Sequence, residues 1–211
     1  MTTDWVRWHE PYADPSSSLS RRRAVVQDVV GRWLDDRAGG PGRVLSICAG
    51  DGRDVLEVLA DRPEDARLLD VALVELDPRL AAAATALALG AGLDRVEVRV
   101  ADAGATDSYV GAIPADLVLA CGVFGNVSDD DVHRTVAMLP GLCAEDALVV
   151  WTRGRDGTDP TPQLRRWFAE QGFAEREWHA PDDARYSVGV HQLVGSPTPL
   201  QPGRRLFTFL R

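Results

Sequence analysis

The residues best placed to do chemistry are two glycines in the stretch Cys48-Ala49-Gly50-Asp51-Gly52. This stretch follows an apolar run from Arg43 to Cys48 and precedes a helical pattern that carries Val55, Leu56 and Leu59. Glycines allow a sharp turn and a close approach of the backbone to a ligand, and the amides at the start of the next helix can bind an anionic group. A plain turn between a strand and a helix would also use two glycines, so the loop alone is a weak indication.

The side chains around the glycines indicate which ligand such a loop would take. A dinucleotide fingerprint has a third glycine where this chain has Val55, and it places a pyrophosphate at the helix start. Asp51 and Asp54 occupy that neighbourhood and would repel a pyrophosphate. A ligand that carries an amine and a sulfonium beside its carboxylate suits two carboxylates better.

Acidic residues end the next two apolar segments. Glu75 follows the run Val71 to Val74 and lies 23 positions after Gly52. A carboxylate there can accept hydrogen bonds from both hydroxyls of a ribose, and Leu76 beside it can pack on an adenine ring. Asp102 follows the run Val96 to Val100 and could accept from an adenine amino group. The plain alternative for both carboxylates is a solvated charge at a strand end.

The elements that must position these residues alternate along the chain. Apolar spacing predicts a first helix that ends near Arg37, with Ser18 and Ser20 as capping candidates. Further strands are expected at 43–48, 71–75, 96–100, 115–121 and 147–152, and helices after the glycine loop and at 80–89, 129–139 and 161–171. Two closing strands are expected at 173–179 and 204–210, the last one antiparallel. Near-continuous apolar strands predict a doubly wound, mostly parallel seven-stranded sheet with helices on both faces.

With these pieces in order, the chain resembles the class I Rossmann-like S-adenosylmethionine-dependent methyltransferases over about residues 43–154. The resemblance rests on the glycine loop, Glu75, Asp102 and a fourth strand that opens into Cys121-Gly122-Val123-Phe124-Gly125-Asn126. It departs from the family at Ser46, where the family has an acidic residue, and at Cys48, where it has a glycine. The resemblance implies S-adenosylmethionine as cofactor and S-adenosylhomocysteine as product. Arg22 or Arg23 could pair with the methionine carboxylate, or could simply begin a solvated basic helix.

The residues expected to contact the cofactor are Cys48, Ala49, Gly50, Asp51, Gly52, Asp54, Glu75, Leu76, Asp77, Ala101, Asp102, Ala103, Cys121, Gly122 and Val123. The residues expected to line an acceptor pocket are Tyr12, Phe124, Asn126 and Tyr186. Methyl transfer from a sulfonium is a direct displacement, so a base is optional. His191 is the candidate base because we expect it in an irregular stretch between the last strands, and His9 is a weaker candidate. Packing is the plain alternative for each of these aromatic and histidine residues.

Composition narrows the function further. The net charge of −9 disfavours a nucleic acid as partner, and the sequence contains no lysine, which excludes a P-loop or a Schiff-base lysine. Its three cysteines lack metal-ligand spacing, so no metal site is expected. No apolar run is long enough to cross a bilayer, and the first residues do not read as a secretory signal, so we expect a cytoplasmic protein.

The sequence therefore favours one domain of 211 residues that methylates a small molecule. Within it we expect an N-terminal arm and helix (1–38), a cofactor-binding core (43–154) and a C-terminal part (155–211) that closes the sheet and could form a substrate lid. Three alternatives stay open: a methyltransferase that acts on protein or RNA, a protein that binds the cofactor without methyl transfer, and a nicotinamide-dependent dehydrogenase.

Overall fold

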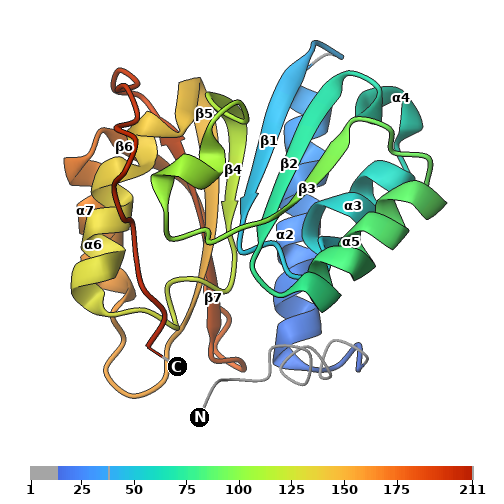
Figure 1. Cartoon of the computed structure of the whole chain (residues 1–211). Coiled ribbons are helices and arrows are strands. Elements are labelled where there is room, and N and C mark those ends of the chain that lie inside the picture. The colour runs from blue at the N-terminus through green and yellow to red at the C-terminus, as the bar shows by residue number, and fades with distance from the viewer. Residues whose placement is uncertain (1–13, 38, 211) are drawn as a thin grey trace.

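A seven-stranded β-sheet forms the centre of the protein, here a computed structural model that describes residues 14–37 and 39–210 (Figure 1). Its strands are β1 (Gly42–Ile47), β2 (Leu69–Glu75), β3 (Val96–Val100), β4 (Ala115–Ala120), β5 (Cys143–Gly154), β6 (Phe173–His179) and β7 (Tyr186–Leu193). Their order is β3-β2-β1-β4-β5-β7-β6. Strands β1 to β5 run parallel, and β7 is antiparallel to both of its neighbours. The predicted doubly wound sheet is confirmed.

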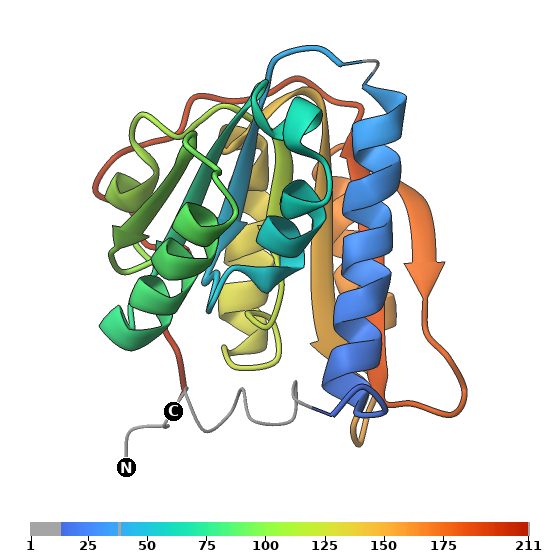
Figure 2. The same cartoon turned by 90° about the vertical axis from the view of Figure 1, so that its right-hand side faces the viewer.

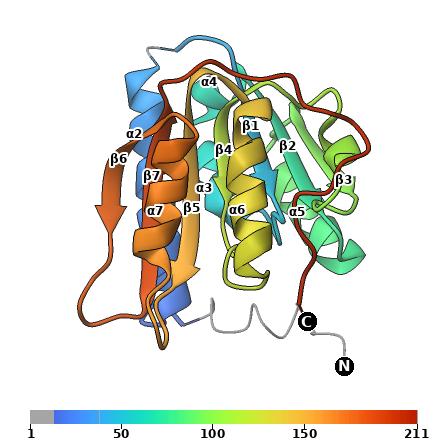
Figure 3. The same cartoon turned by 90° about the vertical axis from the view of Figure 1, so that its left-hand side faces the viewer.

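Helices cover both faces of this sheet. The longer ones are α2 (Ser18–Asp36), α3 (Arg53–Ala60), α5 (Pro78–Gly90), α6 (Asp129–Met138) and α7 (Thr161–Glu170), joined by the short helices α4 (Pro63–Ala66), η2 (Thr106–Tyr109) and η3 (Leu139–Gly141). Helices α2, α3 and α5 lie on one face (Figure 2), and α6 and α7 lie on the other (Figure 3). Each face has its own buried apolar cluster, because each of the longer helices turns apolar residues toward the strands.

Helix α2 shows how closely the sequence pattern is followed. Val26, Val30 and Leu34 recur every four residues and are almost fully buried, as expected for a helix that packs on a sheet. The cap is Ser17 rather than Ser18 or Ser20, and its side chain accepts a hydrogen bond from the Ser20 amide.

The last strand of the sheet differs from the prediction. The segment Tyr186–Leu193, expected to be irregular, is β7 and lies between β5 and β6. Its glycine and its polar residues interrupt the apolar run that marks a buried strand. Gly189 is required by packing, since a Cβ there would lie 2.4 Å from two ring carbons of Trp151. The glycine that obscured the strand pattern thus makes room for the largest buried side chain of the sheet.

The predicted strand at 204–210 is wrong, because this segment lies outside the sheet. It runs extended along the α6 face, toward the end marked C in Figure 3, and forms only isolated bridges from Arg205 and Phe209 to loop residues. Leu206 and Phe207 are buried there. The β3–β4 connection carries only the short helix η2, so this C-terminal segment covers apolar surface that a longer helix would otherwise cover.

The carboxyl ends of β1 to β5 share one edge of the sheet, at the bottom of Figure 1. The strand order reverses between β1 and β4, and ligands of doubly wound sheets bind outside such a reversal. Helix α2 begins at this same edge. Within the described ranges, no helix is long and apolar enough to span a membrane.

Candidate functional site

The glycine loop leaves β1 at the reversal point through an unusual backbone path. Cys48, Gly50 and Gly52 have φ angles of 54°, 59° and 74°, a left-handed region that favours glycine. A Cβ on Gly52 would lie 2.7 Å from the Cδ1 atom of Leu56 and 2.8 Å from that of Leu73. Gly52 therefore lets the loop turn directly into α3 over a closely packed core.

Glu75 fixes this loop to the end of β2. Its Oε2 accepts a hydrogen bond from the Gly50 amide and its Oε1 one from the Asp77 amide, both at 2.8 Å. The carboxylate is 8% exposed. Each oxygen keeps a second lone pair, so Glu75 can still accept hydrogen bonds from a ligand.

The two residues after Glu75 have different surroundings. The Leu76 side chain is 62% exposed, and an apolar residue exposed beside the glycine loop suits contact with a flat ring. Asp77 caps α5 and forms an ion pair with Arg79 at 2.7 Å. The pKa of Asp77 falls to about 2 because the Arg79 side chain and backbone amides hold its charged form. Its carboxylate is thus engaged in the start of the helix.

Asp102 lies in the loop after β3, between Ala101 and Ala103. Its Oδ1 accepts from the Gly104 amide at 2.8 Å, and its Oδ2 pairs with Arg205 of the C-terminal segment at 2.8 Å. The thiol of Cys48 has a pKa well above its usual value because of burial, with added effects of the Glu75 and Asp102 carboxylates. The loops after β1, β2 and β3 therefore converge, as the sequence predicts.

A second group of polar side chains lies on the other side of the glycine loop. Burial raises the pKa of Asp54, while the Arg22 guanidinium and the Cys121 thiol, which donates a hydrogen bond to Asp54, lower it. Arg22 is 8% exposed, a low value for an arginine. Asp51 lies nearby, raises the pKa of Asp54 and forms an ion pair with Arg53 at 2.8 Å. The start of α2, the start of α3 and the end of β4 thus bring opposite charges together.

The loop after β4 is held by hydrogen bonds. The Gly122 amide donates to Oγ1 of Thr152 at 2.8 Å, and the Asn126 side chain donates to the Gly122 carbonyl at 2.7 Å. Val123 and Phe124 are fully buried. Of the residues expected to line an acceptor pocket, Phe124 therefore packs in the core, and Asn126 closes the loop.

The remaining acceptor-pocket candidates divide between the core and the undescribed residues. Tyr186 is 8% exposed and begins β7, opposite Gly154. Tyr12 and His9 lie outside the described residues.

His191 lies inside β7 rather than in an irregular stretch, opposite Val149 of β5. It is 1% exposed, its Nδ1 accepts from the indole of Trp151 at 3.1 Å, and its ring stacks on Phe168. Burial lowers its pKa to about 4. A neutral imidazole with its acceptor nitrogen engaged lacks what a general base needs. This setting favours the packing interpretation of His191.

Sequence reasoning missed several residues that shape this edge. Thr152 and Arg153 lie at the end of β5, and Arg155 directly follows the strand. Arg153 donates to the Phe124 carbonyl and pairs with Asp129 at 2.9 Å, and Arg155 donates to carbonyls of the β6–β7 loop. Their place at a strand end was a usable signal, but their partners are distant in sequence. Among the described residues, no group of histidine, cysteine, aspartate or glutamate side chains is arranged to hold a metal ion.

Comparison with solved structures identifies the fold. Magnesium protoporphyrin IX methyltransferase from Synechocystis PCC 6803, with bound S-adenosylmethionine, matches with a TM-score of 0.68 at 14% identity, over 90% of this chain and 91% of that one. The 1,6-didemethyltoxoflavin-N1-methyltransferase of Burkholderia thailandensis, with bound S-adenosylhomocysteine, matches with 0.64 at 16%, over 90% and 84%. A TehB-like S-adenosylmethionine-dependent methyltransferase from Corynebacterium glutamicum matches with 0.59 at 16%, over 89% and 94%.

No protein-family model matches the sequence, and no curated protein matches it. The chain has the class I S-adenosylmethionine-dependent methyltransferase fold.

Proposed function

We propose that this protein binds S-adenosylmethionine at the carboxyl edge of β1 to β4 and transfers its methyl group to a small-molecule acceptor. The observation that carries the proposal is the asymmetry around the glycine loop. On one side lie two carboxylates, Glu75 and Asp102, with the exposed Leu76. On the other lie the buried Arg22 and the half-buried Asp54, close enough for the arginine charge to lower the pKa of Asp54. The first side suits a nucleoside, and the second suits a group with both an ammonium and a carboxylate.

On the nucleoside side, Glu75 accepts hydrogen bonds from the ribose hydroxyls, and Leu76 packs on the adenine ring. Asp102 accepts from the adenine amino group with the lone pairs that Gly104 and Arg205 leave available. Ala101 and Ala103 flank the ring without bulk. Asp77 acts indirectly, because it holds the start of α5 beneath Leu76.

On the amino-acid side, Arg22 pairs with the methionine carboxylate, and Asp54 with Asp51 accepts from the ammonium. These charges replace the acidic residue that the family carries where this chain has Ser46. Ser46 is 5% exposed within β1, so a carboxylate there would be costly to bury. The backbone of Cys121 to Val123 forms the floor beneath the methyl group.

The bound cofactor supplies an electrophilic methyl group on a sulfonium, and the chain's own residues orient it and exclude water. The rate of methyl transfer then depends on how well the acceptor atom, the methyl carbon and the sulfur are aligned, so most of the catalytic effect comes from positioning. Two methyltransferases of similar fold are named for small molecules, magnesium protoporphyrin IX in one case and 1,6-didemethyltoxoflavin in the other. The net charge of −9 supports the same class of acceptor over a nucleic acid.

Calorimetry with two ligands tests the cofactor site. S-adenosylhomocysteine, the cofactor product, carries both the nucleoside and the amino-acid group. The analogue 5′-methylthioadenosine keeps the nucleoside but lacks the amino-acid group. We expect Arg22→Gln to raise the dissociation constant of S-adenosylhomocysteine about tenfold or more, since a charge-assisted hydrogen bond contributes about 1.5 to 3 kcal/mol. Binding of methylthioadenosine should be unchanged in the same variant, which also shows that it folds.

The matched control is Arg32→Gln, on the same helix but paired with Glu177 away from the loop. Failure of the wild-type protein to bind S-adenosylhomocysteine, or tighter binding of NAD, would overturn the proposal.

A labelled methyl group on S-adenosylmethionine identifies the class of acceptor. Label in the small-molecule fraction of a cell extract supports the proposal, and label in protein or RNA favours the alternative acceptors. Binding without any labelled product favours a protein that only binds the cofactor.

A further inference from the structure

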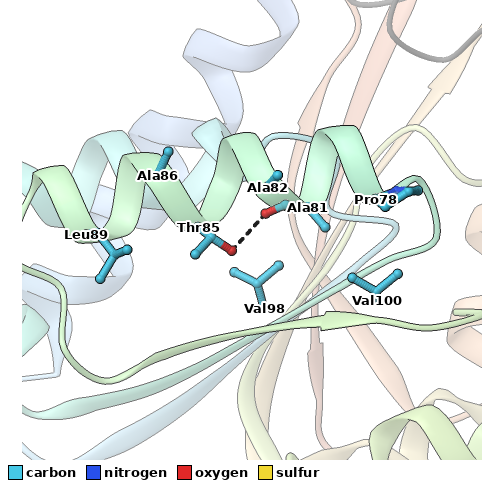
Figure 4. A pocket seen from close by; sticks show the side chains of 8 residues that line it. All are labelled: Pro78, Ala81, Ala82, Thr85, Ala86, Leu89, Val98 and Val100. Carbon is cyan, nitrogen blue, oxygen red and sulfur yellow. Dashed lines mark hydrogen bonds between the residues drawn. The ribbon is translucent and has the colours of Figure 1, made fainter.

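The edge strand β3 and helix α5 expose an apolar surface that begins beside the cofactor edge, at Pro78 and Val100, and extends away from it along α5. A groove of about 410 Å³ lies between them, lined by Pro78, Ala81, Ala82, Thr85, Ala86, Leu89, Val98 and Val100 (Figure 4). Leu89 is 75% exposed and Val100 is 61% exposed. After Arg79, α5 carries no charged residue. An exposed helix normally has a charged outer face, so this apolar surface indicates that something covers it.

The backbone of β3 also has hydrogen-bonding groups that no strand among the described residues pairs with. The Arg95 carbonyl accepts from Val71 of β2, and the Ala101 amide donates to Glu75 of β2. Backbone groups alternate along a strand, so the odd-numbered residues of β3 face β2. The amides and carbonyls of Val96, Val98 and Val100 therefore point to the free edge, where the Val96 amide makes only a long 3.3 Å contact with Leu93.

The side chains of β3 alternate in the same way. Val98 and Val100 face α5 and the groove. Glu97 and Arg99 face the other side, where they pair with each other at 2.7 Å. Arg99 also donates to the carbonyls of Ser108 and Val110, yet its buried Nε lacks a hydrogen-bond partner among the described residues. Because Glu97 and Arg99 have opposite charges, they determine which registers are attractive when two copies of β3 pair with each other.

We propose that this surface binds a second copy of the chain through antiparallel pairing of β3 with its counterpart, centred on Val98. In this register Val98 lies opposite the partner's Val98, and Val96 lies opposite the partner's Val100, so that the edge-facing amides and carbonyls meet. Glu97 then lies opposite the partner's Arg99, in the closer, non-hydrogen-bonded type of pair. Both charge pairs across the two-fold axis are attractive.

Other registers are unfavourable for identifiable reasons. An axis at Val96 or at Val100 leaves only that one residue of β3 opposite the partner's β3. A shift of the axis to Glu97 places two glutamates opposite each other, and a shift to Arg99 places two arginines there. Any register that pairs odd with even residues sets edge-facing groups against groups already bonded to β2. The β3 sequence Val-Glu-Val-Arg-Val thus favours one symmetric arrangement of two identical strands.

The apolar groove fits this arrangement. A two-fold axis perpendicular to the sheet keeps both α5 helices on the same face, where they flank the joined β3 strands. Ala82, Ala86 and Leu89 would then face the partner's α5 across the groove. The two cofactor edges point in opposite directions, so pairing leaves both open. This surface is separate from the residues of the proposed function, and its failure would not affect that proposal.

Sedimentation equilibrium of the full chain over a micromolar concentration range tests the pairing. We expect the wild-type protein to have twice the chain mass, and Glu97→Arg to raise the dissociation constant at least tenfold because it sets two arginines opposite each other. The matched control is Glu64→Arg, a still more exposed glutamate on α4 that likewise pairs with an arginine, Arg67, and it should leave the constant unchanged. A monomeric wild-type protein overturns the proposal, as does a dimer that is indifferent to Glu97→Arg.

Cysteine cross-linking tests the register itself. The proposed axis brings the Cα atoms of the two Val98 residues to about 5.5 Å, within the range for a disulfide. Val98→Cys should therefore form a covalent dimer under mild oxidation. Val100→Cys is the control, since this residue is more exposed but lies far from its own copy. A cross-link by Val100→Cys and not by Val98→Cys would rule out the register, and a dimer that fails to cross-link at either position contradicts strand pairing.

Discussion

Two buried polar side chains, Glu75 and His191, lie in different parts of the sheet and have opposite surroundings. Glu75 ends β2 at the carboxyl edge, and its two oxygens accept from amides of two loops. His191 lies within β7, where aromatic rings surround it and its Nδ1 accepts from Trp151. The first residue orders a surface where a ligand can bind, and the second completes the interior.

The difference between them teaches that position along a strand separates the two roles better than residue type does. Histidine is chemically the better base near neutral pH. However, a pairing position opposite Val149, well inside β5, keeps His191 away from the edge where ligands bind. Glu75 would be an ordinary acid at any other position of β2. At the strand end it becomes the acceptor that holds the glycine loop.

At the carboxyl edge, where Glu75 holds the glycine loop, we expect the largest loss of stability from a side chain at position 52. In Gly52→Ala the new Cβ meets Leu56 and Leu73 below 3.0 Å, and φ stays at 74°. We expect a loss of about 2 to 5 kcal/mol in the free energy of unfolding, from left-handed strain of about 1 to 2 kcal/mol and overpacking of about 1 to 3 kcal/mol. Urea denaturation measures this loss.

Gly92→Ala is the matched control, because Gly92 has a φ of 67° but open space where a Cβ would be. It should lose only the strain part, about 1 to 2 kcal/mol. Equal losses in the two variants would show that the core beneath the loop can adapt, and that the loop path is not fixed by packing.

Much of the carboxyl-edge half could be predicted from the sequence. The glycine loop and Glu75 each follow a near-continuous apolar run, and Asp102 follows the alternating segment Val-Glu-Val-Arg-Val; such patterns locate strands and their ends. Once three strand ends are known, the fold brings them together. The residues that hold the loops are harder to predict, because Thr152 contacts Gly122 and Arg205 contacts Asp102 only through the tertiary structure.

The other half of the sheet was less predictable for a physical reason. In β7 the packing of Trp151 requires Gly189, and the interior includes Ser187 and His191. Glycine and polar residues are typical of loops, and here Ser187 donates to the Arg153 carbonyl and His191 accepts from the Trp151 indole inside the core. The segment at 204–210 has a strand-like pattern because it is extended and half-buried, yet both of its neighbours are loops rather than strands.

The interior half of the comparison can be tested through pH. His191 has a pKa of about 4 in the folded protein, lowered by burial, against an ordinary value of 6.5. Glu175 and Arg165 are the charged groups near it, and the first raises that pKa while the second lowers it. Because the folded pKa is depressed, the neutral imidazole stabilises the fold fully above pH 6.5, and this stability falls as pH drops toward 4. The loss should reach about 3 kcal/mol.

His191→Gln keeps an acceptor for Trp151 but cannot titrate. Its free energy of unfolding should change less than that of the wild-type protein between pH 6.5 and 4, and the difference between the two curves isolates the histidine. Phe168, which stacks on the ring, remains in both proteins. Parallel curves would mean that the pKa of His191 is the same in the folded and unfolded states, and would return it to consideration as a base.

The smallest expected effect on stability tests Glu75 directly. Glu75→Gln keeps the shape of the side chain but can accept from only one of the two loop amides, and it removes a buried charge. The lost hydrogen bond and the relieved desolvation offset each other in part, so we expect a change of about 1 kcal/mol in the free energy of unfolding.

Under the proposed function, Glu75→Gln should also weaken the binding of methylthioadenosine and of S-adenosylhomocysteine about tenfold each, since both ligands contain the ribose. Arg22→Gln should affect only the second ligand, so the pair of variants assigns each half of the ligand to its side of the loop. If Glu75→Gln binds both ligands as tightly as the wild-type protein, Glu75 serves the loop alone, and the contrast with His191 reduces to two structural residues in two different places.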